Sequence, residues 1–277
     1  MDHIKTTTTT THHPSAARAV HIAQHPYHPP HAVIPSYAPN SSSIPSIVGS
    51  FGGLILVVVA SALVLARRRG GNPTLRRTDQ LALCWFALCG FLHCFFEGYF
   101  VLYHASIPSS QTLFAQLWKE YAQSDSRYVT SDPFMLCIEM LTVLIWGPLS
   151  IAAAVCIVRR SPLRHLVQAG LCVGHLYGVA LYYGTCYFEE TFRGVSYSRP
   201  EFLYFWVYYV GFNAPWVVVP ALLLRQSAAA IRRSFVASYG PEEQDDTSLS
   251  PREGNEGHPM SSTVEVKAPS LEAKKHL

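Results

Sequence analysis

The sequence has little charge for its length. Of its 277 residues, 14% are Asp, Glu, Lys or Arg and 49% are hydrophobic, whereas a soluble domain averages about 25% charged residues. The net charge is only +3, and no basic patch is interleaved with aromatic residues, so we expect no nucleic-acid partner. Internal repeats are also missing, which argues against a transporter built from repeated halves.

The sequence lacks any Cys-x-x-Cys pair, the most common metal-binding spacing. Its seven cysteines are Cys84, Cys89, Cys94, Cys137, Cys156, Cys172 and Cys186. The five-residue spacing within the first three puts them on different faces of a helix. We therefore interpret the cysteines as buried apolar thiols and expect no metal centre.

Both ends of the chain lack apolar runs. Residues 1–44 are rich in Thr, His and Pro, and they open without the basic and apolar regions of a cleaved signal peptide. Residues 238–277 are polar and charged. Because such segments bury too little apolar surface to fold, we expect a disordered N-terminal segment over 1–44 and a largely disordered tail over 227–277.

The middle of the chain, residues 45–226, holds five apolar runs of about 20 residues, the length that crosses a bilayer. They are 46–66, 81–103, 134–157, 163–184 and 202–225. The predicted fold class is therefore an all-α polytopic membrane protein, with five transmembrane helices in a bundle and the lipid bilayer as its surroundings.

Arginine is concentrated at one end of these runs. The segment 67–80, the turn between the third and fourth runs, and the segment after the fifth run are all arginine-rich. The positive-inside rule makes them cytoplasmic, so the N-terminus is expected in the lumen. Lys274 and Lys275 stand where a dilysine retrieval signal would stand, which predicts the endoplasmic reticulum membrane.

Several polar side chains lie inside the apolar runs, where ionisable groups are costly and usually functional. His93 and Glu97 are four residues apart and share a helix face. Glu139, His175 and Asn213 lie on three further runs. At a rise of about 1.5 Å per residue, all five fall in the lumenal half or near the bilayer centre, so four helices can contribute to one pocket.

Two carboxyls beside a histidine suit a reaction that adds a proton at one carbon and removes one at another. The alternative is that intramembrane polar groups only hold helices together. That alternative fits His175 and Asn213 better than the set of His93, Glu97 and Glu139. Trp216 lies too deep for the interfacial belt, so it either fills space or lines the pocket.

Three segments carry a family resemblance: LCWFALCGFLHCFFEGYFVLYH, QLWKEYAQSDSRYVTSDPFMLCIEMLTVLIWGPLS and LYFWVYYVGFNAPWVVVPALLL. They resemble the emopamil-binding protein family, the sterol Δ8–Δ7 isomerases. The resemblance implies a five-helix enzyme of the endoplasmic reticulum that uses no cofactor. It implies protonation of the sterol at C9, a carbocation at C8 and loss of a proton from C7. It also implies cationic amphiphilic amines as inhibitors.

The resemblance also implies the site residues. The expected catalytic residues are His93, Glu97, Glu139, Asn213 and Trp216. The expected substrate contacts are Thr142, Tyr128, Asp125, His175, Tyr209 and Phe212. The His93–Glu97 pair is expected to donate the proton and Glu139 to remove one, with the reverse assignment open. Position 175 departs from the family pattern, which has Gln there, so the role of His175 is also open.

The alternative function is a non-catalytic membrane receptor of sterols or cationic amphiphilic ligands. Such a receptor would keep a pocket and an acidic residue but would not need the full set of His, two Glu, Asn and Trp. The full set favours the enzyme. The sequence leaves open the preferred sterol, and whether the chain forms a homodimer or associates with other sterol-pathway enzymes.

Overall fold

The structure is a computed structural model that describes residues 25–69 and 75–239. Its helices form the first of two units into which the chain divides after Ser238. No strand occurs in these two ranges. Five helical segments are long and apolar enough to span a membrane, which confirms the predicted fold class.

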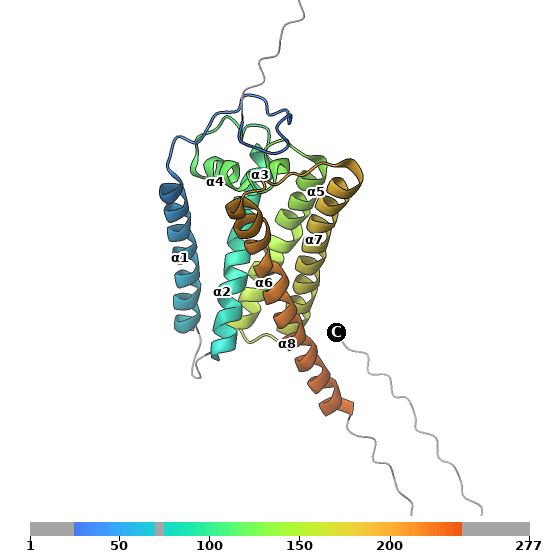
Figure 1. The fold of residues 1–277 in the computed structure, drawn as a ribbon. Coiled ribbons are helices and arrows are strands. Elements are labelled where there is room, and N and C mark those ends of the chain that lie inside the picture. The colour runs from blue at the N-terminus through green and yellow to red at the C-terminus, as the bar shows by residue number, and fades with distance from the viewer. Residues whose placement is uncertain (1–24, 70–74, 240–277) are drawn as a thin grey trace, which may run out of the picture. The chain divides into compact units, whose positions relative to one another are not determined.

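Figure 1 shows the α-helices of the five spans, which also include three π-helical segments. They are α1 (Ile44–Arg69); α2 (Arg77–Phe91) with η1 (Leu92–Glu97) and α3 (Gly98–Tyr103); α5 (Pro133–Leu141) with η3 (Thr142–Trp146) and α6 (Gly147–Val158); α7 (Arg164–Arg193); and η4 (Leu203–Gly211) with α8 (Ala214–Tyr239). Between the second and third spans lie α4 (Leu113–Tyr121) and the 3₁₀ turn η2 (Ser126–Tyr128).

Two spans run further than hydropathy predicts. α7 continues past residue 184 to Arg193 and ends at Gly194, whose φ of 66° is the left-handed cap that glycine favours. α8 continues past residue 225 to Tyr239 because three consecutive alanines, 228–230, extend the helix. Residues 227–239 are therefore helical rather than disordered, and residues 240–277 lie outside the described part.

Part of the N-terminal segment also departs from the expected disorder. Tyr27 and Ile34 are buried in one cluster with Phe100 and Trp118. The Tyr27 hydroxyl donates to the Lys119 carbonyl at 3.0 Å. Residues 25–43 thus cover the end of the helices where α3 and α4 lie (Figure 1). Residues 1–24 lie outside the described part.

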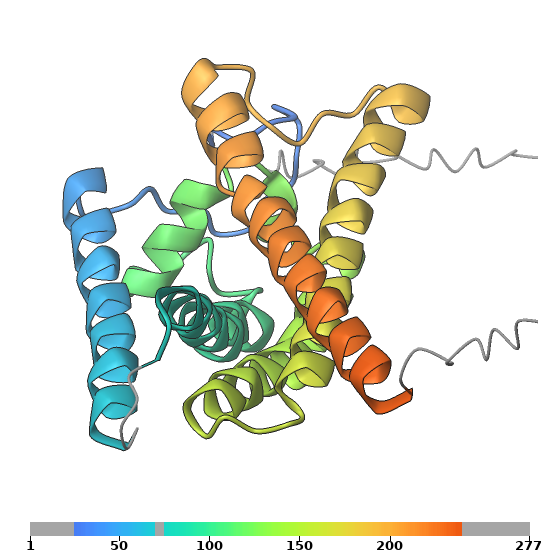
Figure 2. The same cartoon turned by 90° about the horizontal axis from the view of Figure 1, so that it is seen from below.

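Glycines allow the central helices to approach closely. α2 packs against α1 and α6, α6 packs against α7, and α1 stands at one edge beside α2 (Figure 2). A Cβ atom on Gly147 would lie 2.6 Å from the Cys94 Sγ and 3.3 Å from the His93 Cβ. A Cβ on Gly174 would meet the Trp146 ring at 2.6–2.8 Å. These two contacts fix where His93 and His175 lie.

Candidate active site

Two π-helical segments that contact each other form the centre of the candidate site. η1 carries His93 and Glu97, and η3 begins at Thr142, one turn after Glu139. A π segment adds a residue to one turn and is frequent at functional sites. Within η1, the Phe96 carbonyl accepts a hydrogen bond from the Trp118 indole at 3.0 Å.

His93 connects Glu97 to His175. Its Nδ1 lies 2.8 Å from the Glu97 Oε2, and its Nε2 lies 3.1 Å from the His175 Nε2. His93 is 3% exposed and His175 4%, whereas the Glu97 side chain is 15% exposed. If neutral His93 donates from Nδ1 to Glu97, it accepts at Nε2, so His175 donates from its Nε2.

This assignment of protons agrees with the surroundings of Nδ1, the second ring nitrogen of His175. The His175 Nδ1 is buried and has no hydrogen-bond partner within the described residues. A neutral imidazole with its proton on Nε2 leaves Nδ1 as an acceptor. A buried acceptor without a partner is tolerated better than a buried donor without one. His175 therefore takes part in the same hydrogen-bonded chain as His93 and Glu97.

Glu139 brings a second carboxyl to the site. It is 8% exposed, and its Oε1 accepts a hydrogen bond from the Tyr128 hydroxyl at 2.8 Å. The Glu139 carboxyl also lies close enough to that of Glu97 for the two to interact electrostatically. Burial, together with the neighbouring Glu139 carboxyl, raises the pKa of Tyr128 well above its ordinary value, so this hydroxyl remains a donor.

Asn213 reaches this cluster through tyrosines. Its Nδ2 donates to the Tyr209 carbonyl at 2.8 Å and to the Tyr121 hydroxyl at 3.3 Å. The rings of Tyr121 and Tyr128 have centroids 5.4 Å apart. Tyr128 in turn holds Glu139, so Asn213 from the fifth span is connected to the carboxyls by two side chains.

Trp216 lies against another tryptophan. Its ring centroid is 5.2 Å from that of Trp85 on α2, and the planes are inclined at 59°. The Trp85 indole nitrogen is buried without a hydrogen-bond partner among the described residues. Sequence reasoning missed Trp85 because an aromatic residue in an apolar run gives no signal of its own.

Asp125 anchors the loop rather than opening into the site. It is fully buried, and its two carboxylate oxygens accept from the Arg127 side chain at 2.6–3.1 Å. Arg127 also donates to the Thr185 hydroxyl and the Cys186 Sγ, each at 2.9 Å. This network ties η2 to α7 and so holds Tyr128 beside Glu139.

Three other expected contact residues make local interactions. The Thr142 hydroxyl donates to the Ile138 carbonyl of its own helix at 2.9 Å. The Tyr209 carbonyl accepts from Asn213, and its ring packs on neighbouring tyrosines. Phe212 is 51% exposed and stacks on Tyr208 at 4.9 Å.

One group of side chains has the composition of a metal site. The ligand atoms of Cys89, His93 and His175 lie within 4.8 Å of one another, and all three residues are buried. Thiolate and imidazole suit zinc or copper. His93 and His175 are hydrogen-bonded to each other through their Nε2 atoms, so a metal ion held by these two atoms would break that bond. The spacing of the cysteines alone did not predict this group.

The family EXPERA (EXPanded EBP superfamily) matches residues 113–227. The chain is 38% identical over 203 residues to the 3-beta-hydroxysteroid-Delta(8),Delta(7)-isomerase of Cavia porcellus, covering 73% of this chain and 87% of that protein. The chain belongs to the EXPERA family. Two further relatives show the range of this family.

One further relative is the probable 3-beta-hydroxysteroid-Delta(8),Delta(7)-isomerase of Oryza sativa subsp. japonica. It is 32% identical over 217 residues, which is 78% of this chain and 95% of that protein. Another is isomeliandiol synthase of Melia azedarach, 36% identical over 148 residues, which is 53% and 67% of the two chains. The EXPERA match includes Glu139, His175 and Asn213 and begins after His93 and Glu97.

Proposed function

We propose that this EXPERA protein is a sterol Δ8–Δ7 isomerase. The observation that carries the proposal is a pair of neighbouring carboxyls, Glu97 and Glu139, with His93 hydrogen-bonded to one and Tyr128 to the other. Three of the compared relatives in mammals and a probable one in rice bear the name of this activity. A purely structural polar contact would need neither two carboxyls nor a histidine.

In the first step, the His93–Glu97 pair gives a proton to C9 of the sterol. The π electrons of the C8=C9 bond form the new C9–H bond, which leaves a positive charge at C8. His175 holds the His93 ring through the bond between their Nε2 atoms. This bond orients the donor because both nitrogens of His93 are engaged.

In the second step, Glu139 removes the proton from C7. The electrons of the C7–H bond form the C7=C8 bond and discharge the cation. One proton enters the sterol and one leaves, so no cofactor or oxidant is required. Between turnovers Glu139 releases this proton to water and the donor pair takes one up from water, so the site returns to its starting state.

The cation at C8 needs a negative field and no attacking water. The two carboxyls supply the field in surroundings of low dielectric constant. The Trp216 ring supplies a face for a cation–π contact, and Trp85 packs against that ring. A lipophilic amine, once protonated, imitates the cation and should inhibit.

We propose further that the enzyme lies in the endoplasmic reticulum membrane with its N-terminus in the lumen and its C-terminus in the cytoplasm. The arginine-rich segments support this orientation, and Lys274 and Lys275 lie outside the described residues. A glycosylation tag at the N-terminus should be modified in microsomes and one at the C-terminus should not. The reverse pattern would overturn the orientation.

The test of the function is conversion by the purified full chain. Supplied with a Δ8 sterol in nanodiscs, it should release the Δ7 isomer, identified by gas chromatography and mass spectrometry. Sterol binding without any Δ7 product would instead support the alternative of a membrane sterol receptor and end the isomerase proposal.

A further inference from the structure

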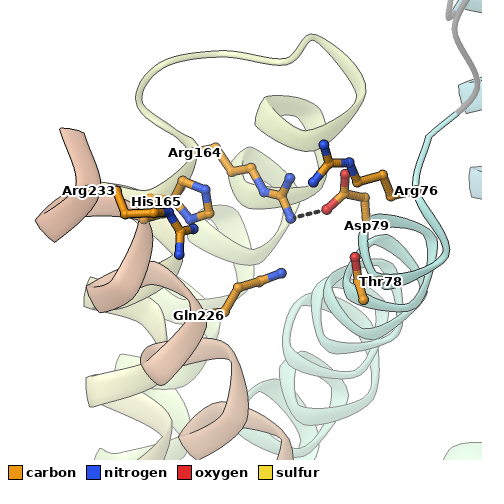
Figure 3. Close-up of a pocket in the computed structure, with 8 residues that line it drawn as sticks. Arg76, Thr78, Asp79, Arg164, His165, Gln226 and Arg233 are labelled. Carbon is orange, nitrogen blue, oxygen red and sulfur yellow. Dashed lines mark hydrogen bonds and ion pairs between the residues drawn. The ribbon is translucent and has the colours of Figure 1, made fainter. Parts of the chain in front are cut away.

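A cavity of about 180 Å³ lies away from the carboxyl cluster, between the first turns of α2 and α7 and the later part of α8 (Figure 3). Asp79 at this cavity precedes His93 by 14 residues on the same span, which corresponds to about 21 Å along a helix. The cavity is smaller than the roughly 300–1,000 Å³ of pockets for drug-sized ligands. Its size suits a small polar group rather than a sterol.

The cavity carries excess positive charge. Arg76, Arg164 and Arg233 line it together with one carboxylate, Asp79. Arg164 donates to the Asp79 Oδ1 at 2.7 Å, but no ion pair involves Arg76 or Arg233 among the described residues. The Arg164 Nε is buried and has no hydrogen-bond partner there. Among the described residues, the guanidinium groups of Arg76 and Arg233 therefore have no counter-ion.

Uncharged hydrogen-bond donors add to the positive potential of the cavity. α2 and α7 both begin at the cavity, and neither N-terminus has a side-chain cap, so their partial positive charges are available to an anion. The Gln226 oxygen accepts from the Gln168 amide at 2.9 Å, which leaves the Gln226 amide nitrogen to point into the cavity (Figure 3).

The position of the cavity identifies the source of the anion. Arg77 and Arg164 begin the second and fourth membrane spans, so the cavity lies at the level of lipid headgroups. Basic pockets between membrane helices at this level bind anionic headgroups. Guanidinium groups also form paired hydrogen bonds with phosphate oxygens.

We propose that this cavity binds the phosphate group of an anionic phospholipid. Arg76 and Arg233 bind the phosphate oxygens, Gln226 donates a further hydrogen bond, and Asp79 offsets the charge of Arg164. The proposal concerns a site apart from the carboxyl cluster, and it is independent of the isomerase reaction.

The test uses the purified full chain and a double variant, Arg76→Gln with Arg233→Gln. Both arginines lack a carboxylate partner in the described structure, so their loss should cost little stability. Lipid binding is measured by native mass spectrometry after exchange into phosphatidylinositol or phosphatidylcholine. The wild type should retain phosphatidylinositol preferentially, and the double variant should weaken its retention at least tenfold.

The matched control is Arg67→Gln with Arg68→Gln. These arginines are exposed at the end of α1, and they do not line the cavity, so the control removes the same charge without touching the site. Binding close to that of the wild type supports the proposal. An equal loss in both double variants would overturn it, because general attraction of anionic lipid to a basic end would then suffice.

Two further measurements test whether the cavity binds an anion and whether that anion is a lipid headgroup rather than free phosphate. Asp79→Asn adds one net positive charge and should strengthen phosphatidylinositol retention severalfold, whereas unchanged or weaker retention by the folded variant would count against an anion site. Inorganic phosphate in the millimolar range should displace the lipid weakly. If it displaces the lipid completely and phosphatidylinositol shows no preference over phosphatidylcholine, the lipid assignment fails.

Discussion

At the scale of single residues, each ionisable group deep in the spans has a partner that offsets the cost of its burial. Glu97 bonds to His93, His93 to His175, and Glu139 to Tyr128. An unpaired buried charge would cost several kcal/mol. The pairs therefore make these groups tolerable in hydrocarbon while leaving protons that can move between them.

The two carboxyls are the first residues to test. Glu97→Gln and Glu139→Gln keep the size of the side chain but remove proton exchange, so each should lower turnover at least about a hundredfold, the low end of general acid–base contributions. Turnover is measured on purified protein with a Δ8 sterol. Near-normal turnover in both variants would contradict the mechanism, provided that both still bind the sterol.

Substitutions of His175 test whether the proton donor, the His93–Glu97 pair, has to be held in a fixed orientation. His175→Gln keeps a hydrogen-bonding group opposite the His93 Nε2 and should cost less than about tenfold in turnover, whereas His175→Leu removes the group and should cost more than about tenfold. Equal losses in the two variants would assign His175 to packing alone. Sterol affinity, measured separately, should change little in either variant.

Trp216 tests the cationic intermediate. Trp216→Leu should weaken a lipophilic amine by about thirtyfold, because a desolvated cation–π contact is worth about 2 kcal/mol and about 1.36 kcal/mol is tenfold. The amine affinity of Trp216→Phe should lie between that of the wild type and that of Trp216→Leu. The control ligand is a neutral analogue of the same amine, whose binding should be nearly unchanged. Equal losses for amine and neutral analogue would mean that Trp216 only fills space.

The sequence identified the candidate residues but not their contacts. His93, Glu97, Glu139 and His175 stand out because ionisable side chains in apolar runs are rare. Their distances depend on how three helices pack, and no one-dimensional pattern encodes that packing. For this reason the link between His93 and His175, the hydrogen bond from Tyr128 to Glu139 and the nearness of Cys89 were not predicted.

At the scale of elements, hydropathy located the five spans but not the π segments. A π segment inserts one residue into a turn without changing composition, so η1 and η3 left no trace in the apolar pattern. Helix ends were also displaced where residues less apolar than the span continued a helix, as in α7 and α8. Hydropathy reports the depth of a residue in the membrane, not where its helix ends.

Close packing at Gly147 should control the geometry of η1. Gly147→Ala puts a Cβ 2.6 Å from the Cys94 Sγ, so it should destabilise by about 1–3 kcal/mol and lower turnover by displacing His93. Thermal unfolding and turnover are measured together. The matched control is Gly170→Ala in α7, where a Cβ meets nothing within 4 Å and alanine favours the helix.

This comparison separates packing from propensity. Gly170→Ala should be neutral or slightly stabilising and should keep full turnover. If Gly147→Ala is equally harmless, then the close approach of η1 to α6 does not hold the donor in place.

At the scale of the whole molecule, the EXPERA fold brings polar groups from four spans to one region. Residues 25–43 and α4 cover the end of the helices above that region. The Asp125–Arg127 network fixes the loop between the second and third spans to the fourth. A rigid apolar substrate can enter such a site sideways from the bilayer, and the covered end limits the access of water.

The central claim is that this cluster moves protons on a sterol without a cofactor. Its most direct test is isomerisation of a Δ8 sterol by the purified full chain in deuterium oxide, with the product analysed by mass spectrometry and NMR. The expected product is a Δ7 sterol that carries one deuterium at C9 and has lost one hydrogen from C7, formed at least about a hundredfold more slowly by Glu97→Gln or Glu139→Gln. A Δ7 product without deuterium at C9, or no Δ7 product from the wild-type chain, would contradict it.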